Sequence, residues 1–320
     1  MGPHLMDADE FAALFATHRG ELRVHCYRML GSYDEAEDLV QETFLRSWKG
    51  IETFAGRSTL RAWLYRIATN ACLDTLHGKA RRVLPHDVDD SAEPLWLQPF
   101  PDGPDTAAVD RETLELAFLA AIQHLPPWQR AVLILRDVLG WRAAETADLL
   151  DHSVPSVHSA LRRARVTMRE HLPERRLDWA RPSEPTDHEK AVLRRYMTAM
   201  ERADLTAMAT LLAEDVRTTM PPYREWFQGR TAVIDALTTT WNPRSPLYVG
   251  RFHPLATSAN RQPAVAAYVC RDDETRHAFA ISVLRIEGDH IAEATAFHDT
   301  SVFARFDLPM SFPASHRLSR

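Results

Sequence analysis

Apolar residues recur every three or four positions over most of the first 80 residues. This spacing is typical of helices that bury one face. After a break at Gly31, Ser32 and Glu35 form a Ser-x-x-Glu capping box, which marks a helix start. The pattern predicts a small all-α domain over residues 7–83. Its apolar positions are Phe11, Leu14, Phe15, Leu22, Leu39, Val40, Phe44, Trp48, Leu60, Leu64, Ile67 and Ala71.

Residues 84–110 lose this periodicity and are rich in proline and aspartate. Proline cannot sustain a helix or a central strand, so we expect an acidic linker here. Helical spacing returns at Arg111, with Leu114, Phe118 and Ile122, and continues to about His171. The sequence therefore predicts a second all-α domain over residues 111–176.

The last third of the chain has a different pattern. After a linker at 177–186, a helical stretch from Val192 to Leu212 is followed by runs typical of strands, at Ala264–Cys270 and Phe279–Ile286. Gly288-Asp289 between alternating apolar residues predicts a tight hairpin. We therefore expect an α+β domain over residues 187–310, with a tail at 311–320.

Composition limits the class of protein. The 320 residues carry a formal net charge of −6, with 45% hydrophobic and 26% charged residues, which favours an ordinary folded chain over a general nucleic-acid coat. Cys26, Cys72 and Cys270 are too far apart for a metal motif, so we expect small buried residues in a reducing cytoplasm and no metal or cofactor. No apolar run reaches the ~20 residues that a membrane-spanning helix needs.

The segment Arg142–Arg169 has the pattern of a helix-turn-helix. A short helix ends at the turn Asp151–Ser153, and the next helix starts with Pro155 in its first turn. Val157 and Leu161 fall on its inner face, whereas arginine forks and short hydroxyls, which suit a major groove, face outward. An ordinary amphipathic helix with a solvated arginine face is the alternative. The candidate DNA-binding residues are Ser156, His158, Ser159, Arg162 and Arg163.

Two motifs in the first domain carry a family resemblance. Asp34–Phe44 with Trp48, and the segment Phe54-x-Gly-x-Ser-x-Leu-x-x-Trp-Leu-x-x-Ile-Ala-x-Asn70, resemble extracytoplasmic-function (ECF) sigma factors of the sigma-70 family. The helix-turn-helix then corresponds to region 4. The resemblance implies core RNA polymerase as a partner, through its β′ clamp coiled coil and β flap. It implies that these residues bind polymerase: Asp34, Glu35, Asp38, Gln41 and Glu42.

The second motif resembles the segment with which the family reads the −10 element. Capturing a base of the melted strand costs a few kcal/mol, so a loop must offer a pocket and a helix must hold phosphates. We expect Trp63 to pack in the core, because it shares a helix with Leu60 and Leu64. The candidate −10 contacts are Arg57, Ser58, Arg61, Arg66, Asn70, Arg81 and Arg82.

The acidic linker has two interpretations. It could be a spacer alone, or, as the resemblance implies, it could thread toward the polymerase active centre, where carboxylates mimic RNA phosphates. The string Trp96–Asp102 resembles the SigG-like subgroup, whose members carry a C-terminal extension. The candidate mimics are Asp87, Asp89, Asp90 and Glu93.

The C-terminal domain resembles the SnoaL-like, NTF2-like fold, in which helices and a curved sheet enclose a conical pocket. The resemblance rests on Leu211–Val216, Pro221–Arg230 and Ala296–Thr300. His298 and Asp299 could act in acid/base catalysis, but neighbours on a strand point to opposite faces, so only one can face the pocket. We favour an intramolecular regulatory contact over ligand sensing and over an enzyme. The candidate pocket residues are Tyr223, Trp226, Trp241, Tyr268, Phe279, His298 and Asp299.

The sequence therefore predicts two all-α domains followed by an α+β domain, acting as an ECF sigma factor that reads −10 and −35 promoter elements under the influence of its C-terminal domain. One alternative is a one-component helix-turn-helix regulator with a ligand-binding sensor. Another is a SnoaL-like enzyme with a DNA-binding fusion. Neither alternative gives the acidic helix at Asp34–Trp48 a role.

Overall fold

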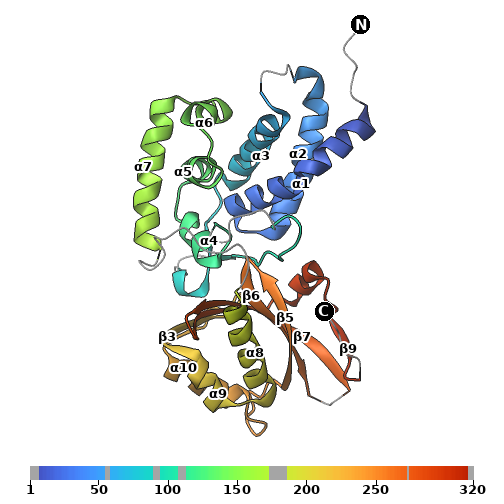
Figure 1. Ribbon diagram of the computed structural model, residues 1–320, viewed down its shortest axis with the longest axis vertical. Coiled ribbons are helices and arrows are strands. Elements are labelled where there is room, and N and C mark those ends of the chain that lie inside the picture. The colour runs from blue at the N-terminus through green and yellow to red at the C-terminus, as the bar shows by residue number, and fades with distance from the viewer. Residues whose placement is uncertain are drawn as a thin grey trace. The chain divides into compact units, whose positions relative to one another are not determined.

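The computed structural model describes residues 7–54, 58–88, 94–106, 113–172, 186–271 and 274–315. The chain divides into two compact units. Unit 1 comprises Met1–Val83 and Gly103–Arg181, and unit 2 comprises Leu84–Asp102 and Pro182–Arg320. Figure 1 colours the helices of unit 1 from blue to green and the sheet and helices of unit 2 from olive to red.

In the part of unit 1 that the structure describes, the regular elements are helices apart from the short strand β1 (Arg82–Val83). Side chains that accept a hydrogen bond from the first turn start several of its helices: Asp7 for α1, Ser32 for α2, Thr59 for α3 and Ser153 for α7. Its helices are α1 (Ala8–Leu30), α2 (Tyr33–Gly50), η1 (Ile51–Thr53), α3 (Leu60–Leu76), α4 (Leu116–Gln123), α5 (Pro127–Leu133), η4 (Ile134–Val138), α6 (Ala143–Leu150) and α7 (Val154–His171).

The apolar faces predicted for the first three helices meet in one core. Phe11 and Phe15 of α1 pack against Phe44 of α2, with ring centroids 5.7 and 5.1 Å apart, and Trp48 lies 5.5 Å from Phe11. Leu64 of α3 is fully buried. The helical spacing therefore identified most of the positions that pack inward, but Leu14 is exposed, so its assignment to the buried face was wrong.

Buried arginines join this core to the helices that follow the linker. The Arg28 guanidinium of α1 donates to the Thr113 carbonyl at 3.2 Å. Arg130 of α5 donates to the carbonyls of Gln123 and Leu125, at 3.0 and 3.1 Å, and to the Met29 carbonyl at the end of α1. Because each carbonyl needs a partner once buried, these donors bind the two helical halves into one unit.

Unit 2 contains a mixed sheet in the order β4-β3-β8-β7-β6-β5, with β9 paired to β7. β3 and β8 are parallel, and the other pairs are antiparallel. The elements are η2 (Pro85–Asp87), β2 (Leu95–Trp96), α8 (Asp187–Arg202), α9 (Leu205–Leu211), β3 (Leu212–Thr219), β4 (Trp226–Gln228), α10 (Arg230–Thr240), β5 (Arg251–Ala259), β6 (Gln262–Cys270), β7 (Thr275–Glu287), β8 (His290–Phe297), η6 (Thr300–Phe306) and β9 (Ser311–Pro313).

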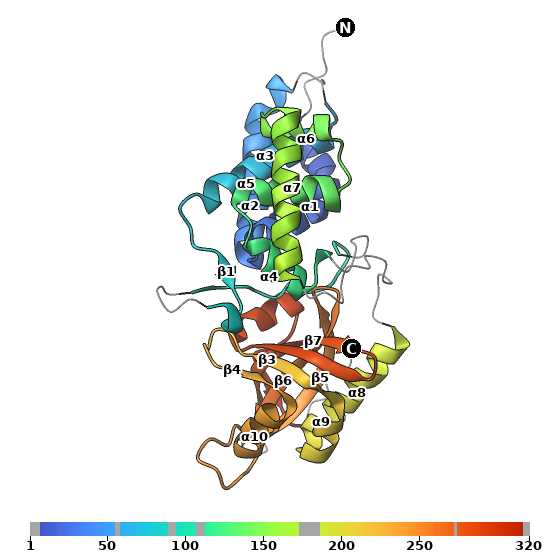
Figure 2. The same cartoon turned by 90° about the vertical axis from the view of Figure 1, so that its left-hand side faces the viewer.

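The two faces of this sheet have different covers. Helices α8, α9 and α10 lie together on one side of the strands (Figures 1 and 2). There Val265 and Ala267 of β6 join Trp241 and Phe252 in one apolar cluster. On the opposite face Tyr268 packs against Phe303 and Phe312, with ring centroids 5.2 and 4.8 Å apart. The predicted strands are present, and so is the hairpin, in which Gly288 has a φ of 56°.

The helical stretch predicted from Val192 to Leu212 is interrupted. α8 ends before Ala203, which has a φ of 49°, and Asp204 then caps α9 by accepting a hydrogen bond from the Ala207 amide. Asp204 favours a new helix start, because its carboxylate satisfies an amide that the first turn leaves free.

The segment Leu84–Asp102 is part of unit 2 rather than a spacer alone. Phe100 is buried, and its amide donates to Asn260 Oδ1 at 2.9 Å while its carbonyl accepts from the Asn260 amide at 2.8 Å. The Arg261 amide donates to Asp102 Oδ1 at 2.9 Å, and Leu97 is also buried. Apolar side chains between the prolines therefore give this segment a packing role that its proline and aspartate content conceals.

Cys26, Cys72 and Cys270 are free and buried, as the sequence predicts. Among the helices of the described residues, none is long and apolar enough to cross a membrane.

The buried His25 gives unit 1 a testable acid sensitivity. Its Nε2 lies 2.9 Å from Thr69 Oγ1, and burial, reinforced by the charge of Arg28, lowers the pKa of His25 to about 3. The unfolded chain takes up a proton near the ordinary pKa of 6.5, whereas the folded chain does not. Titration of His25 therefore has no effect on the free energy of unfolding above pH 6.5 and lowers it progressively as the pH falls toward 3.

His25→Gln keeps a polar group beside Thr69. We expect this variant to take up one proton fewer on unfolding than the unaltered chain. Between pH 5.5 and 4 the slope should fall by about 1.4 kcal/mol per pH unit. Urea unfolding at several pH values measures this slope. His158→Gln is the control, because His158 is exposed and should leave the slope as it is. An unchanged slope for His25→Gln would contradict the assignment.

Candidate nucleic-acid interface

Helix α7 has the buried and exposed faces expected of a recognition helix. α6 ends at Asp151, which has a φ of 55°, and Ser153 Oγ accepts from the Ser156 amide at 3.3 Å to start α7. This is the turn that the sequence predicts. The face packed inward consists of Val157, Ala160, Leu161, Ala164 and Met168.

The predicted DNA-binding residues lie on the other face of α7. Ser156, His158, Arg162 and Arg163 are exposed, and Ser159 is half-buried. The Arg163 guanidinium donates to Ser159 Oγ at 2.8 Å, so the two side chains hold each other in place on the helix surface. Among the described residues Arg162 forms no ion pair, so its guanidinium can bind a base edge or a phosphate.

Arg165 differs from its neighbours on α7. Its guanidinium makes a bidentate ion pair with Asp137, at 2.8 and 2.7 Å. The charge is therefore already neutralised within unit 1, which supports leaving Arg165 out of the predicted groove contacts.

The residues proposed for the −10 element fall into two groups. Ser58, Arg66 and Asn70 are exposed, with Arg66 and Asn70 one turn apart on α3. Arg61 is instead bonded to Glu21, at 2.7 Å. Arg57 lies outside the described residues. Trp63 is half-buried and packs on Phe54, with ring centroids 5.0 Å apart, which agrees with the predicted packing role.

Arg81 and Arg82 are also engaged within unit 1. Arg82 pairs with Glu35 at 3.0 Å, Lys79 contacts the same carboxylate at 3.1 Å, and Arg81 lies 3.2 Å from His124 Nε2. Burial alone would raise the pKa of Glu35, but Arg82 and Lys79 hold it below its usual value. Glu35 and Arg82, which the resemblance assigns to different partners, therefore contact each other.

The exposed face of α2 is narrower than the sequence suggests. Asp34, Asp38 and Gln41 are exposed and lie three or four residues apart, whereas Glu42 bonds to Arg46 at 2.7 Å. Leu45 continues the same stripe with half of its surface (50%) exposed. Sequence reasoning missed Leu45, although its position four residues after Gln41 was the available signal. We call Asp34, Asp38, Gln41 and Leu45 the α2 stripe.

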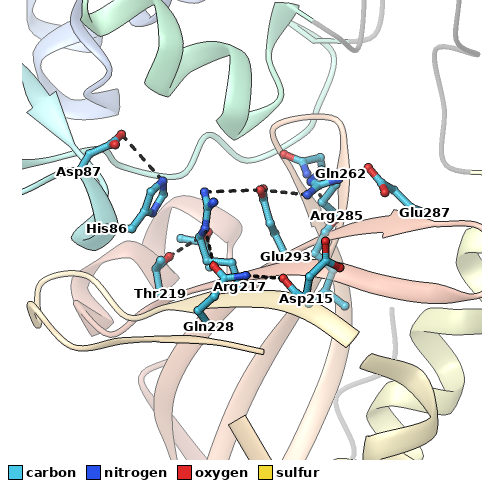
Figure 3. A network of polar contacts seen from close by, with 12 residues as sticks. His86, Asp87, Asp215, Arg217, Thr219, Gln228, Gln262, Arg285, Glu287 and Glu293 are labelled. Carbon is cyan, nitrogen blue, oxygen red and sulfur yellow. Dashed lines mark hydrogen bonds and ion pairs between the residues drawn. The ribbon is translucent and has the colours of Figure 1, made fainter. Parts of the chain in front are cut away.

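A network of charged residues lies on β3, β8 and β7 of unit 2 (Figure 3). Glu293 sits between two arginines, 3.9 Å from Arg217 and 3.0 Å from Arg285. His86 of the linker segment lies beside it, with its ring centroid 6.3 Å from that of Trp226. Burial lowers the pKa of His86, and Arg217 adds to the effect. The carboxylates of Asp87 and Glu293 oppose this shift, so burial is what favours a neutral imidazole against this face.

The phosphate-mimic candidates are only partly described. Asp87 lies 3.9 Å from His86 Nε2, so its carboxylate faces a group within unit 2. Asp89, Asp90 and Glu93 lie outside the described residues.

Some of the candidate pocket residues form a continuous chain of rings. Trp241 contacts Phe252, Phe252 contacts Phe279, Phe279 contacts His298, and His298 contacts Tyr223, with centroids 4.8–6.0 Å apart. Trp241 is buried at one end, and Tyr223 is 55% exposed at the other. This chain runs from the apolar cluster to the surface.

The structure places the other three pocket candidates apart from this chain of rings. Tyr268 faces the opposite side of the sheet, because strand alternation separates it from Ala267. Trp226 lies beside His86 of the linker segment. Asp299 caps η6, where its Oδ1 accepts from the amide and hydroxyl of Ser301 at 3.0 and 2.7 Å.

His298 is therefore not paired with Asp299. Its amide donates to the Pro221 carbonyl at 2.8 Å, and burial lowers the pKa of its imidazole to about 4 despite the opposing effect of a hydrogen bond to the Phe279 main chain. The ring lies among aromatic groups as a neutral imidazole. Both residues follow the end of β8 at Phe297, so strand alternation does not apply to them, and only His298 lies against the aromatic chain because Asp299 caps η6.

Comparison with known proteins agrees with this architecture. Family models match at residues 14–82 (Sigma-70 region 2), 115–168 (Sigma-70, region 4) and 193–294 (SnoaL-like domain). The chain is 41% identical over 319 residues to the ECF RNA polymerase sigma factor SigG of Mycobacterium tuberculosis, covering 94% of this chain and 85% of that protein.

Other relatives match part of the sequence or the fold. ECF RNA polymerase sigma factor SigW of Bacillus subtilis is 32% identical over 170 residues, covering 52% of this chain and 90% of SigW. The crystal structure of the Mycobacterium tuberculosis ECF sigma factor SigJ has the same fold, with a TM-score of 0.63 and 21% identity, covering 93% of this chain and 99% of that one. The chain belongs to the ECF sigma factors of the sigma-70 family and carries a SnoaL-like C-terminal domain.

Proposed function

We propose that this sigma factor binds core RNA polymerase and directs promoter-specific initiation of transcription in the cytoplasm. The observation that carries the proposal is the α2 stripe, in which acidic, amide and apolar groups stand together on one exposed helix face. A regulator that only bound DNA would have no use for this stripe. The proposed polymerase partner is the β′ clamp coiled coil, with the β flap as the partner of region 4.

Two further surfaces are proposed to read promoter DNA. The outer face of α7 reads the −35 element, with Arg162 and Arg163 as its cationic contacts. Ser58, which precedes α3, and the exposed Arg66 and Asn70 of α3 read the −10 element, and Arg61 takes part from the same helix with its guanidinium held by Glu21. Contacts with phosphates fix the position of the protein on the DNA, and contacts with bases provide its sequence specificity.

The SnoaL-like domain is proposed to regulate rather than to catalyse. Its Asp299 carboxylate is used as a helix cap, which removes it as an acid/base partner of His298. Its contact with Phe100 and Asp102 supports a regulatory role, because those residues belong to the segment that joins regions 2 and 4. Holding this segment restricts how far apart the two DNA-reading regions can move.

Charge reversal in the α2 stripe tests polymerase binding. We expect Asp38→Lys to weaken the affinity for core RNA polymerase by tenfold or more, since it places a cation in an interface that selects an anion. Asp235→Lys, which makes the same change on the exposed face of α10, is the matched control and should bind as the unaltered chain does. Titration of labelled protein with core enzyme measures both. Equal affinity for all three proteins would refute the assignment.

Removing an outward arginine tests −35 recognition. We expect Arg162→Ala, in holoenzyme, to lower transcription at strong promoters by about tenfold and to relax sequence preference at one −35 position, because a good base contact provides ~1–3 kcal/mol. Run-off transcription from a promoter library measures preference. Arg165→Ala is the control, since Arg165 already pairs with Asp137. A uniform loss at every promoter would instead identify Arg162 as a phosphate contact.

The Asn260 contact tests regulation through the linker segment. Asn260→Gly tolerates the φ of 56° but loses the acceptor for the Phe100 amide, which should cost about 1 kcal/mol and release the segment. Asn260→Asp keeps an oxygen acceptor and serves as the control. We expect faster hydrogen exchange of the Phe100 amide and more run-off transcription at limiting protein for the glycine variant. Faster exchange with unchanged transcription would count against regulation by this contact.

A further inference from the structure

Trp141, which precedes α6 in the C-terminal half of unit 1, packs on α3. Its ring centroid lies 5.3 Å from that of Tyr65, and the Arg61 guanidinium carbon lies 5.8 Å from the Trp141 ring and 4.9 Å from the Tyr65 ring. Arg61 is thus in contact with two aromatic groups from different parts of the chain. We call Arg61 and Tyr65 the α3 platform.

Glu21 of α1 holds the α3 platform in place. Its carboxylate accepts from Arg61 at 2.7 Å and from the Tyr65 hydroxyl at 3.2 Å. Tyr65 is 1% exposed, and burial raises the pKa of its hydroxyl. The tyrosine therefore stays a neutral donor, and Glu21 orients its hydroxyl and the Arg61 guanidinium through contacts that do not involve Trp141.

Trp141 is held from its own side by main-chain contacts. Its amide donates to the Leu135 carbonyl at 3.0 Å, and its carbonyl accepts from the Arg136 guanidinium. These bonds lie within the η4–α6 region, so the indole moves with that region rather than with α3. Separation of the two helical halves would uncover the platform.

The cleft around Trp141 is lined by groups of opposite charge on its two sides. It has a volume of about 540 Å³, and its α3 side includes Thr59, Trp63 and Arg66. Glu145 and Asp148 of α6 line the other side. A phosphate approaching Arg66 would meet these carboxylates, and like charges in a confined site repel. The cleft therefore excludes a nucleic-acid strand while α6 remains packed here.

We propose that the α3 platform is a stacking site for a nucleobase of single-stranded promoter DNA and that Trp141 occupies it in the compact unit. This inference rests on the proposed function and adds a base-binding role for Tyr65. The Trp141 indole contacts the Tyr65 ring at an interplanar angle of 53°. An indole and a nucleobase are flat π systems of similar size, and both pack on aromatic rings and on guanidinium groups. Trp141 and a base therefore compete for one surface.

The direct test measures binding of the full-length protein, without polymerase, to a fluorescent single-stranded DNA 12-mer of random sequence. Random sequence suffices, because stacking is tolerant of base identity. We expect Trp141→Ala to increase affinity about tenfold, or about 1.4 kcal/mol, as the release of one stacking surface would give. Trp141→Phe keeps a ring on the platform and should bind as weakly as the unaltered chain.

A second site identifies where the base binds. In the Trp141→Ala background, Tyr65→Phe keeps the ring and should retain the gain in affinity, whereas Tyr65→Leu should abolish it. Trp141→Leu, which keeps apolar bulk without a ring, replaces Trp141→Ala if the smaller side chain prevents folding. Leu247→Ala, on an exposed loop of unit 2, controls for a general effect of lost apolar surface.

Two results would overturn the inference. One is unchanged single-strand affinity for both the alanine and leucine variants of Trp141, and the other is a gain that survives Tyr65→Leu. Both leave the proposed function intact if the unaltered protein still binds core polymerase and supports run-off transcription. Failure of the unaltered protein in those two assays would remove the proposed function instead.

Discussion

The guanidinium of Arg130 is the contact on which the compact form of unit 1 depends. It lies in a buried position, where burial lowers its pKa to about 10, and it donates to carbonyls of Met29, Gln123 and Leu125. Two of these carbonyls precede α5 and the third ends α1, so one side chain ties region 2 to region 4. Opening the unit requires this cation to exchange buried carbonyls for water, an exchange with a small net free-energy change although each bond is strong. A link of this kind can be specific and still be reversible.

The helical spacing and the helix-turn-helix could be predicted from the sequence because they depend on local geometry. Val157, Leu161, Ala164 and Met168 are buried in α7 as their period requires, and Ser153 caps the helix that it precedes. The side of the sheet on which an aromatic residue lies was harder to predict. Tyr268 and Trp226 are apolar enough for a pocket, but strand register decides which face they reach, and bulges shift that register. One register error exchanges the two faces.

The ionic partners could not be predicted, since they join residues far apart in the sequence. Glu35 and Asp38 look equivalent on α2, yet only Glu35 is reached by Lys79 and Arg82. Arg61 and Arg66 lie on the same helix, but Glu21 engages only Arg61. Spacing shows which residues share a helix face, whereas the packing of other helices determines which charges remain available to an external partner.

The path of the linker segment has a consequence for how shortened forms of this protein behave. Because Leu97 and Phe100 are buried in unit 2, a chain cut before α8 would retain these apolar side chains without the strands that bury them. Such a fragment would expose an apolar patch at the same time as it lost the C-terminal domain. Self-association through this patch could then be mistaken for a change in regulation. Point substitutions at Asn260 avoid this confusion, since they loosen the segment and leave its apolar cover in the molecule.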